Sequence, residues 1–152
     1  MEYEYCYKVD DLKEYINYLN ENYKYIDSYE ERRTIYRNSN DTNARITLKK
    51  GIYTLDFKEN KISNDDLIVR KESKSITFDN LDNCEDILSF LNYKKDNSMY
   101  RKRTIYEGNN IKFEIDEYIE PEKAYVVSFE GNKDICDIVN NDLKALNDIH
   151  KI

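Results

Sequence analysis

Apolar and polar positions alternate through much of residues 100–131, and this pattern predicts neighbouring β-strands. Over residues 111–118, one face carries Ile111, Phe113 and Ile115, and the opposite face is charged or polar. This period of two is typical of a strand with one buried face. The segment Glu107-Gly-Asn-Asn110 predicts a tight hairpin turn, because Gly and Asn tolerate positive φ.

The same patterns predict the other elements. Alternation favours strands at 2–8, 31–37, 44–49 and 52–58, and a strand or strand pair over 67–78. Apolar residues at helical spacing predict helices over 11–22, 81–93 and 134 to about 149. Short connections favour antiparallel neighbours. We therefore expect a mainly β (α+β) fold with eight or nine antiparallel strands and about three flanking helices.

The polar faces of these strands indicate how the sheet is arranged. In the first strand Tyr3, Tyr5 and Tyr7 share one face, while Glu2 and Glu4 share the other. A sheet with this many strands and few residues to cover its polar faces favours closure into a barrel. The charged faces would then line a tunnel, and buried charges are costly unless a ligand satisfies them. The sequence thus predicts a closed antiparallel β-barrel tunnel that binds or transforms a ligand.

Composition narrows the class of protein. A length of 152 residues favours a single domain spanning 1–152, and 15 Tyr and 5 Phe supply packing area for its core. The net charge of −7 argues against a general nucleic-acid-coating role. Three widely separated cysteines suggest neither a disulfide framework nor a zinc site. Without a signal sequence or membrane span, we expect a soluble intracellular protein of the cytoplasm, the nucleus or a viral replication site.

Charged residues suggest the chemistry of the tunnel. Glu2 and Glu4 would face the same way about 7 Å apart on one strand, where they repel unless a cation lies between them. Carboxylates near guanidinium groups suit a polyphosphate bridged to a divalent metal. The sequence has no glycine-rich phosphate loop and no Ser-His dyad, and its single histidine, His150, is expected at the surface.

These motifs resemble those of the triphosphate tunnel metalloenzymes, which include the CYTH proteins. The resemblance rests on Glu2-x-Glu4, on Arg101-x-Arg103 followed thirteen residues later by Asp116, and on the last strand, Val126-Val-Ser-Phe-Glu130. Within that superfamily, Arg-Lys-Arg-x-x-Tyr leading to Phe-x-Ile-Asp is most similar to the metal-dependent RNA 5′-triphosphatases of fungi and large DNA viruses. By element order the resemblance spans nearly the whole chain.

The resemblance implies roles for particular residues. Glu2, Glu4 and Glu130 would hold Mg²⁺ or Mn²⁺. The phosphate-binding residues would be Arg45, Arg70, Lys74, Arg101 and Arg103. Asp116 would orient the arginines or a metal-bound water, and Glu72 or Glu114 would position the attacking water; with Arg103 these form the implied catalytic set. Two positions depart from the family pattern: Ser128 replaces a glutamate, and Cys6 replaces a lysine, with Lys8 following on the same face.

The resemblance implies a divalent-metal-dependent triphosphatase that removes the γ-phosphate from the 5′ end of RNA, the first step of mRNA capping. A guanylyltransferase is the partner expected in such systems. The alternatives are a triphosphatase acting on tripolyphosphate, thiamine triphosphate or nucleotides, and a non-catalytic polyphosphate- or nucleotide-binding module. A solvated β-domain that binds a partner is a further alternative. The preferred metal and the oligomeric state stay open.

Overall fold

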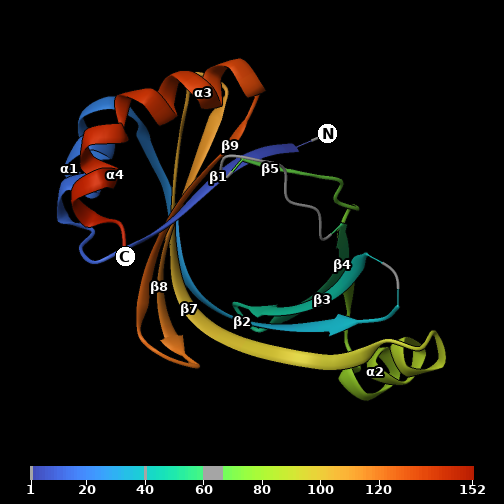
Figure 1. The fold of residues 1–152 in the computed structure, drawn as a ribbon. Coiled ribbons are helices and arrows are strands. Elements are labelled where there is room, and N and C mark those ends of the chain that lie inside the picture. The colour runs from blue at the N-terminus through green and yellow to red at the C-terminus, as the bar shows by residue number, and fades with distance from the viewer. Residues whose placement is uncertain (1, 40, 60–66) are drawn as a thin grey trace.

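The computed structural model describes residues 2–39, 41–59 and 67–152, and it shows a bent β-sheet with helices on its outer side (Figure 1). This confirms the predicted mainly β fold. The strands are β1 (Glu2–Val9), β2 (Lys24–Arg37), β3 (Thr42–Lys49), β4 (Ile52–Glu59), β5 (Leu67–Arg70), β6 (Ile76–Phe78), β7 (Lys94–Gly108), β8 (Ile111–Glu120) and β9 (Ala124–Gly131). The helices are α1 (Lys13–Asn22), α2 (Leu81–Phe90), α3 (Lys133–Asp142) and α4 (Lys144–His150).

Within the described residues the nine strands form one antiparallel sheet in the order β5-β1-β9-β8-β7-β2-β3-β4-β6. The two ends of this order are joined by a single segment. Strand β5 pairs with β1, and the residues directly after it bond to β4 through a Lys58–Glu72 bridge and the hydrogen bond from Ser73 N to Phe57 O at 2.8 Å. The polypeptide therefore encircles the concave face, although β5 and β6 are not paired with each other as strands.

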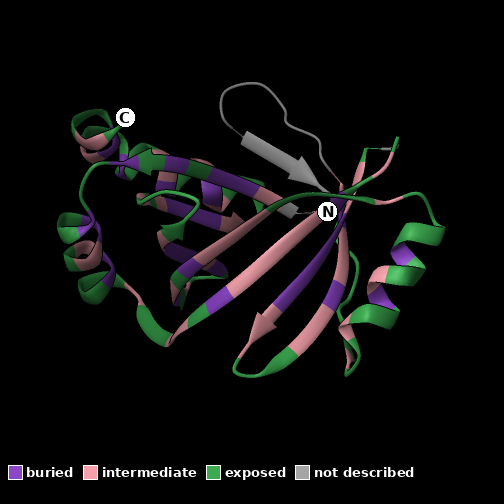
Figure 2. Ribbon diagram, turned by 90° about the horizontal axis from the view of Figure 1, so that it is seen from below, coloured by how far each residue is buried: buried purple, intermediate pink, exposed green. Residues whose placement is uncertain are grey.

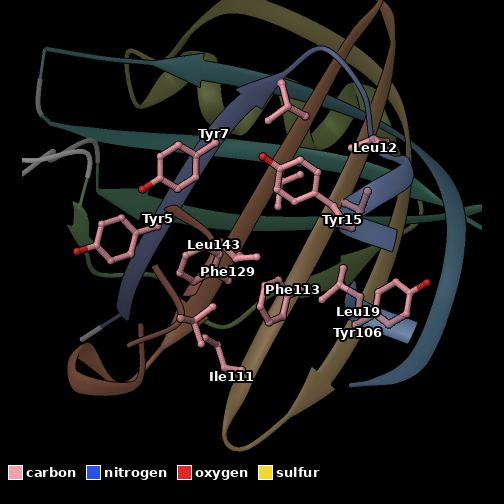
Figure 3. Packing of buried hydrophobic residues seen from close by; sticks show 14 of the residues in the cluster. Tyr5, Tyr7, Leu12, Tyr15, Leu19, Tyr106, Ile111, Phe113, Phe129 and Leu143 are labelled. Atoms are coloured by element: carbon pink, nitrogen blue, oxygen red, sulfur yellow. The ribbon is translucent and has the colours of Figure 1, made fainter. Parts of the chain in front are cut away.

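The larger hydrophobic core lies between the outer face of the sheet and helices α1, α3 and α4 (Figure 3). Tyr5, Phe113 and Phe129 contribute to it from β1, β8 and β9, and Tyr15 and Leu19 contribute from α1. The tyrosine face of β1 packs outward as expected, and Tyr5 donates a hydrogen bond to Asp137 of α3 at 2.8 Å. The alternation along β1 thus sends its aromatic rings into this core and its polar residues to the concave face.

A smaller core forms where β2, β3 and β4 pack against α2, through Tyr36, Ala44, Ile46, Leu55 and Leu88. Burial follows the same division over the molecule: the helices are exposed on their outward sides, while the strands carry buried and half-buried residues (Figure 2). Both helical layers lie on the outer face, so neither fills the concave side of the sheet (Figure 1).

Some element boundaries differ from the prediction. The single C-terminal helix expected from 134 to 149 is divided at Leu143 into α3 and α4, so the chain has four helices in its described part. Strands β2 and β7 begin at Lys24 and Lys94, well before the expected starts. The polar first half of each strand pairs with the second half of the other, so Lys24 lies opposite Glu107 and Lys94 lies opposite Arg37. No described helix is long and apolar enough to cross a membrane.

Candidate functional site

The concave face of the sheet lines a cavity of about 650 Å³. Residues two apart on one strand point to the same face, so each strand contributes a short polar row. In the described part of the chain, eight basic and seven acidic side chains line it, close to charge balance in a protein of net charge −7. They are Arg33, Arg45, Lys49, Lys50, Lys58, Arg101, Arg103 and Lys112, with Glu4, Glu31, Asp56, Glu72, Glu114, Asp116 and Glu130.

Three carboxylates gather at one side of this cavity. Glu4 of β1 lies directly opposite Glu130 of β9, and Glu114 of β8 approaches them across the sheet. One oxygen from each carboxylate lies within 4.8 Å of the others. Glu4 and Glu114 are buried, and Glu130 is 20% exposed. Such a cluster of hard oxygen donors fits a divalent cation, which would relieve the mutual repulsion of the three charges.

Next to these carboxylates, Arg101 and Arg103 of β7 form a buried ion-pair network. Arg103 donates to both oxygens of Asp116 at 2.8 and 2.9 Å and also pairs with Glu114. Arg101 donates from Nε and Nη2 to Glu31 at 2.9 and 2.7 Å. Burial by itself would lower the pKa of Arg103, but hydrogen bonding to Asp116 and the negative charge of Glu114 raise it well above its ordinary value. Both arginines are therefore permanent cations.

A second ion-pair group lies on the β3–β4 side of the cavity. Arg45 of β3 donates to both oxygens of Asp56, at 2.8 Å from Nε and 2.5 Å from Nη2, and to Glu72 at 2.6 Å. Lys58 of β4 lies 3.6 Å from the second oxygen of Glu72. Glu72 is the most exposed of these groups, with about a third of its side chain accessible (34%). It therefore anchors the segment after β5 onto the basic residues of β3 and β4.

Sequence reasoning missed two charged residues of β2, Glu31 and Arg33. Glu31 is buried, and although its burial favours the neutral acid, the charges of Arg33, Arg101 and Arg103 lower its pKa. Arg33 has the opposite tendency: burial and the nearby cations Arg101 and Arg45 lower its pKa to about 10. The available signal was the alternation Tyr29, Glu31, Arg33, which places all three on the face that lines the cavity.

The structure places most of the predicted site residues in the cavity. Glu4, Glu130, Arg45, Arg101, Arg103, Asp116, Glu72 and Glu114 all line it. Glu114, expected to position the attacking water, also lies in the carboxylate cluster with Glu4 and Glu130. Glu2 and Arg70 pair in the β1–β5 ladder, but their side chains lie outside the described residues.

The expected role of Lys74 does not agree with its position. Lys74 is exposed and does not line the cavity, because it lies between the Ser73 contact with β4 and the start of β6. Cys6 and Ser128, the two departures from the family pattern, both line the cavity and lie opposite each other. Lys8 is exposed and does not line it, so it does not take the place of the lysine that Cys6 replaces.

No protein-family model matches the sequence, and no curated protein sequence matches it. Solved structures do share its fold. The PH1012 protein of Pyrococcus horikoshii OT3 is 19% identical, with a TM-score of 0.76 over 95% of this chain and 90% of that one. HpAC1 of Hippeastrum, a candidate adenylyl cyclase with a dominant triphosphatase activity, is 12% identical, with a TM-score of 0.72 over 95% and 87%.

A chain in the Mediator head module of Schizosaccharomyces pombe is similar to the same degree. It is 10% identical, with a TM-score of 0.70 over 95% of this chain and 96% of that one. At these identities the comparisons establish the fold alone. The fold therefore does not by itself determine the activity, which must be argued from the residues of the cavity.

Proposed function

We propose that this chain is a divalent-metal-dependent triphosphatase that releases the γ-phosphate of a triphosphate held in the cavity. The observation that carries the proposal is the contact between two charge groups. Arg103 pairs with Glu114, which belongs to the carboxylate cluster, and with Asp116, which also lies 3.5 Å from Arg101. A cation site and a guanidinium site therefore share a boundary, as the binding of a metal–phosphate complex requires.

The donor set fits a hard divalent cation. Glu4, Glu114 and Glu130 would hold Mg²⁺ or Mn²⁺, and in the family pattern Glu2 would add a fourth carboxylate. When bound, the cation would neutralise negative charge on the phosphates and so favour attack by water. Lys112, 3.7 Å from Glu130, balances part of the carboxylate charge, and the charges of Glu114 and Glu130 raise its pKa despite its burial.

The arginines would supply the phosphate grip. A guanidinium offers directed pairs of donors that match phosphate oxygens, and stabilisation of this kind acts mainly on charge in the transition state. Asp116 holds Arg103 through two hydrogen bonds and so fixes the direction of its remaining donors. Either Glu114 or Glu72 would orient the attacking water, since both carboxylates face the cavity from different walls.

For the substrate, we propose the 5′-triphosphate end of RNA, with a guanylyltransferase as the partner of the next step. This rests on the resemblance of Arg101-Lys-Arg103 and Asp116 to capping triphosphatases. A small-molecule triphosphate is the second candidate, favoured by the dominant triphosphatase activity of HpAC1, whose fold this chain shares. The charged side chains of the cavity suit the phosphate and metal groups that both substrates have in common.

Phosphate release from a panel of substrates tests the proposal. Triphosphate-ended RNA, ATP, thiamine triphosphate and tripolyphosphate would each be incubated with the protein and Mg²⁺ or Mn²⁺. Metal-dependent release from at least one substrate is expected, and the ratio of kcat/KM values between RNA and tripolyphosphate identifies the substrate class. If the protein bound a triphosphate but released no phosphate with either metal, the non-catalytic binding module would be favoured. If it neither bound a triphosphate nor released phosphate, the proposed triphosphatase function would be refuted.

A further inference from the structure

Four arginines line the cavity in the described part of the chain, and three of them face a carboxylate directly across the sheet. Arg101 lies opposite Glu31, Arg103 opposite Asp116, and Arg45 opposite Asp56. Each of these pairs is joined by a hydrogen bond of 2.9 Å or shorter. Strand register alone therefore supplies each of the three guanidinium groups with a counter-charge.

Arg33 is the exception. Its cross-strand neighbours are Met99 of β7 and Thr47 of β3, and neither carries a charge. Its Nε donates to Thr47 Oγ1 at 3.0 Å, and the closest carboxylate oxygen among the described residues, on Glu31, lies 3.9 Å away. That oxygen accepts two shorter hydrogen bonds from Arg101. The only carboxylate near Arg33 in the described part of the chain is therefore distant and already accepts hydrogen bonds from Arg101.

Arg33 lies in a largely buried, positively charged part of the cavity, where the lack of a close carboxylate is unfavourable. Its side chain is only 16% exposed, and its surroundings include the cations Arg101 and Arg45. Burying a charge without a close partner is unfavourable, because the charge loses its hydration and gains no counter-charge in return. The lowered pKa of Arg33 reflects the same strain, because burial and neighbouring positive charges both disfavour its charged form. An anion bound in the cavity would stabilise the charged form of Arg33.

We infer that Arg33, held by Thr47, forms a phosphate-binding subsite on the basic side of the cavity, separate from the carboxylate cluster. The subsite rests on the proposed function and extends it: Arg33 would bind phosphate oxygens of the triphosphate that the cation does not hold. Its terminal amino groups need not give up a close carboxylate before they bind phosphate. The other three arginines each begin with such a partner.

Strand β2 itself provides the matched control. Arg32 neighbours Arg33 but points to the opposite face, where it pairs with Glu120 at 2.8 Å and lies over the Tyr100 ring. Its side chain is 42% exposed. Replacing Arg32 or Arg33 by Met removes one positive charge in each case, so long-range electrostatics change by the same amount. A difference in ligand affinity between the two variants therefore comes from the local surroundings of Arg33 and not from the change in net charge.

Calorimetric titration of metal-free protein with tripolyphosphate tests the subsite without turnover. Arg33→Met should weaken binding by about 10- to 100-fold, the range expected for charge-assisted hydrogen bonds, and Arg32→Met by less than about threefold. Thr47→Val, which removes only the hydroxyl that holds Nε, should weaken binding by a few-fold. Thermal unfolding without ligand should give Arg33→Met a Tm equal to or above that of the wild type.

The outcomes separate this inference from the proposed function. Equal affinities of Arg32→Met and Arg33→Met would overturn the subsite, even if the wild type hydrolyses tripolyphosphate with Mn²⁺. A wild type that binds tripolyphosphate through Arg33 but releases no phosphate from any substrate would preserve the subsite and refute the triphosphatase. A lower Tm for Arg33→Met with unchanged affinity would assign Arg33 a structural role instead.

Discussion

The two walls of the cavity carry opposite charges. Among the side chains that the structure describes, strands β1, β8 and β9 contribute four acidic residues and one basic residue to the cavity. Strands β2 and β7 and the β3–β4 hairpin contribute seven basic residues and two acidic ones. Within each wall like charges lie close together, which is unfavourable in a partly buried site. The division is suited to a ligand that itself carries both charges, such as a metal–polyphosphate complex. The role of each wall can therefore be tested by replacing its charged side chains.

The largest effect is expected from the acidic wall. Glu4→Gln keeps the size of the side chain but removes one of the three clustered charges, so metal binding should fail and phosphate release should fall by about 1000-fold or more. Isothermal titration with Mn²⁺ and a phosphate-release assay would measure the two losses. Unfolding should show unchanged or higher stability, because a repulsion is removed.

The control for Glu4→Gln is Glu117→Gln on β8. Glu117 lies opposite Lys102, on the outward face of the same wall, and does not line the cavity. Its replacement should leave Mn²⁺ affinity and phosphate release within about twofold of the wild type. Full activity of Glu4→Gln would remove Glu4 from the site and would leave the acidic wall without a catalytic role.

The basic wall should respond to a change that preserves charge. Arg103→Lys keeps the cation but loses the fork that binds both oxygens of Asp116, so kcat/KM should fall by the equivalent of about 2–4 kcal/mol. Lys102→Ala, on the exposed opposite face of β7, should be nearly silent. Equal and small effects in the two variants would mean that the alternation along β7 does not separate a functional face from an ordinary surface.

A smaller effect is expected from adding charge to the acidic wall. Ser128 of β9 is buried and lies opposite both Cys6 and Glu114. Since this position lacks the glutamate of the family pattern, the wild type should prefer Mn²⁺ or require about millimolar Mg²⁺. Ser128→Glu should lower the half-saturating Mg²⁺ concentration several-fold, and Ser128→Ala should not. If the half-saturating Mg²⁺ concentration of Ser128→Glu equalled that of the wild type, position 128 would not determine the metal affinity.

The smallest effect is expected from replacing His150, which lies on α4, outside both walls of the cavity. His150 of α4 contacts Asp10 at 2.7 Å and Glu14 at 3.0 Å, and hydrogen bonds to these carboxylates raise its pKa above the ordinary value of 6.5. The protonated imidazole therefore stabilises the folded state below pH 6.5, and this contribution disappears as the pH rises through the higher folded-state pKa. His150→Asn should remove that part of the pH dependence of Tm without changing phosphate release. An unchanged pH profile would contradict the assignment.

The sequence by itself determined which side chains share a face of a strand. Side-chain direction alternates with each residue, so Glu4 with Cys6, Arg101 with Arg103, and Glu114 with Asp116 could be assigned together from local pattern alone. The same alternation predicted the tyrosine face of β1. The Gly and Asn residues of 107–110 predicted the turn there, and the short connections predicted antiparallel strands. Helix boundaries were less certain: the division at Leu143 interrupts an apolar spacing that continues on both sides of it.

Tertiary structure alone decided which faces meet. Strand order and register brought Glu114 to Glu4 and Glu130, placed Lys74 outside the cavity, and left Arg33 opposite Met99 and Thr47 rather than a carboxylate. These relations join residues up to 126 positions apart, as for Glu4 and Glu130, and a one-residue shift in pairing would change every one of them. Local periodicity fixes the direction of a side chain, but its partner depends on packing of the whole sheet.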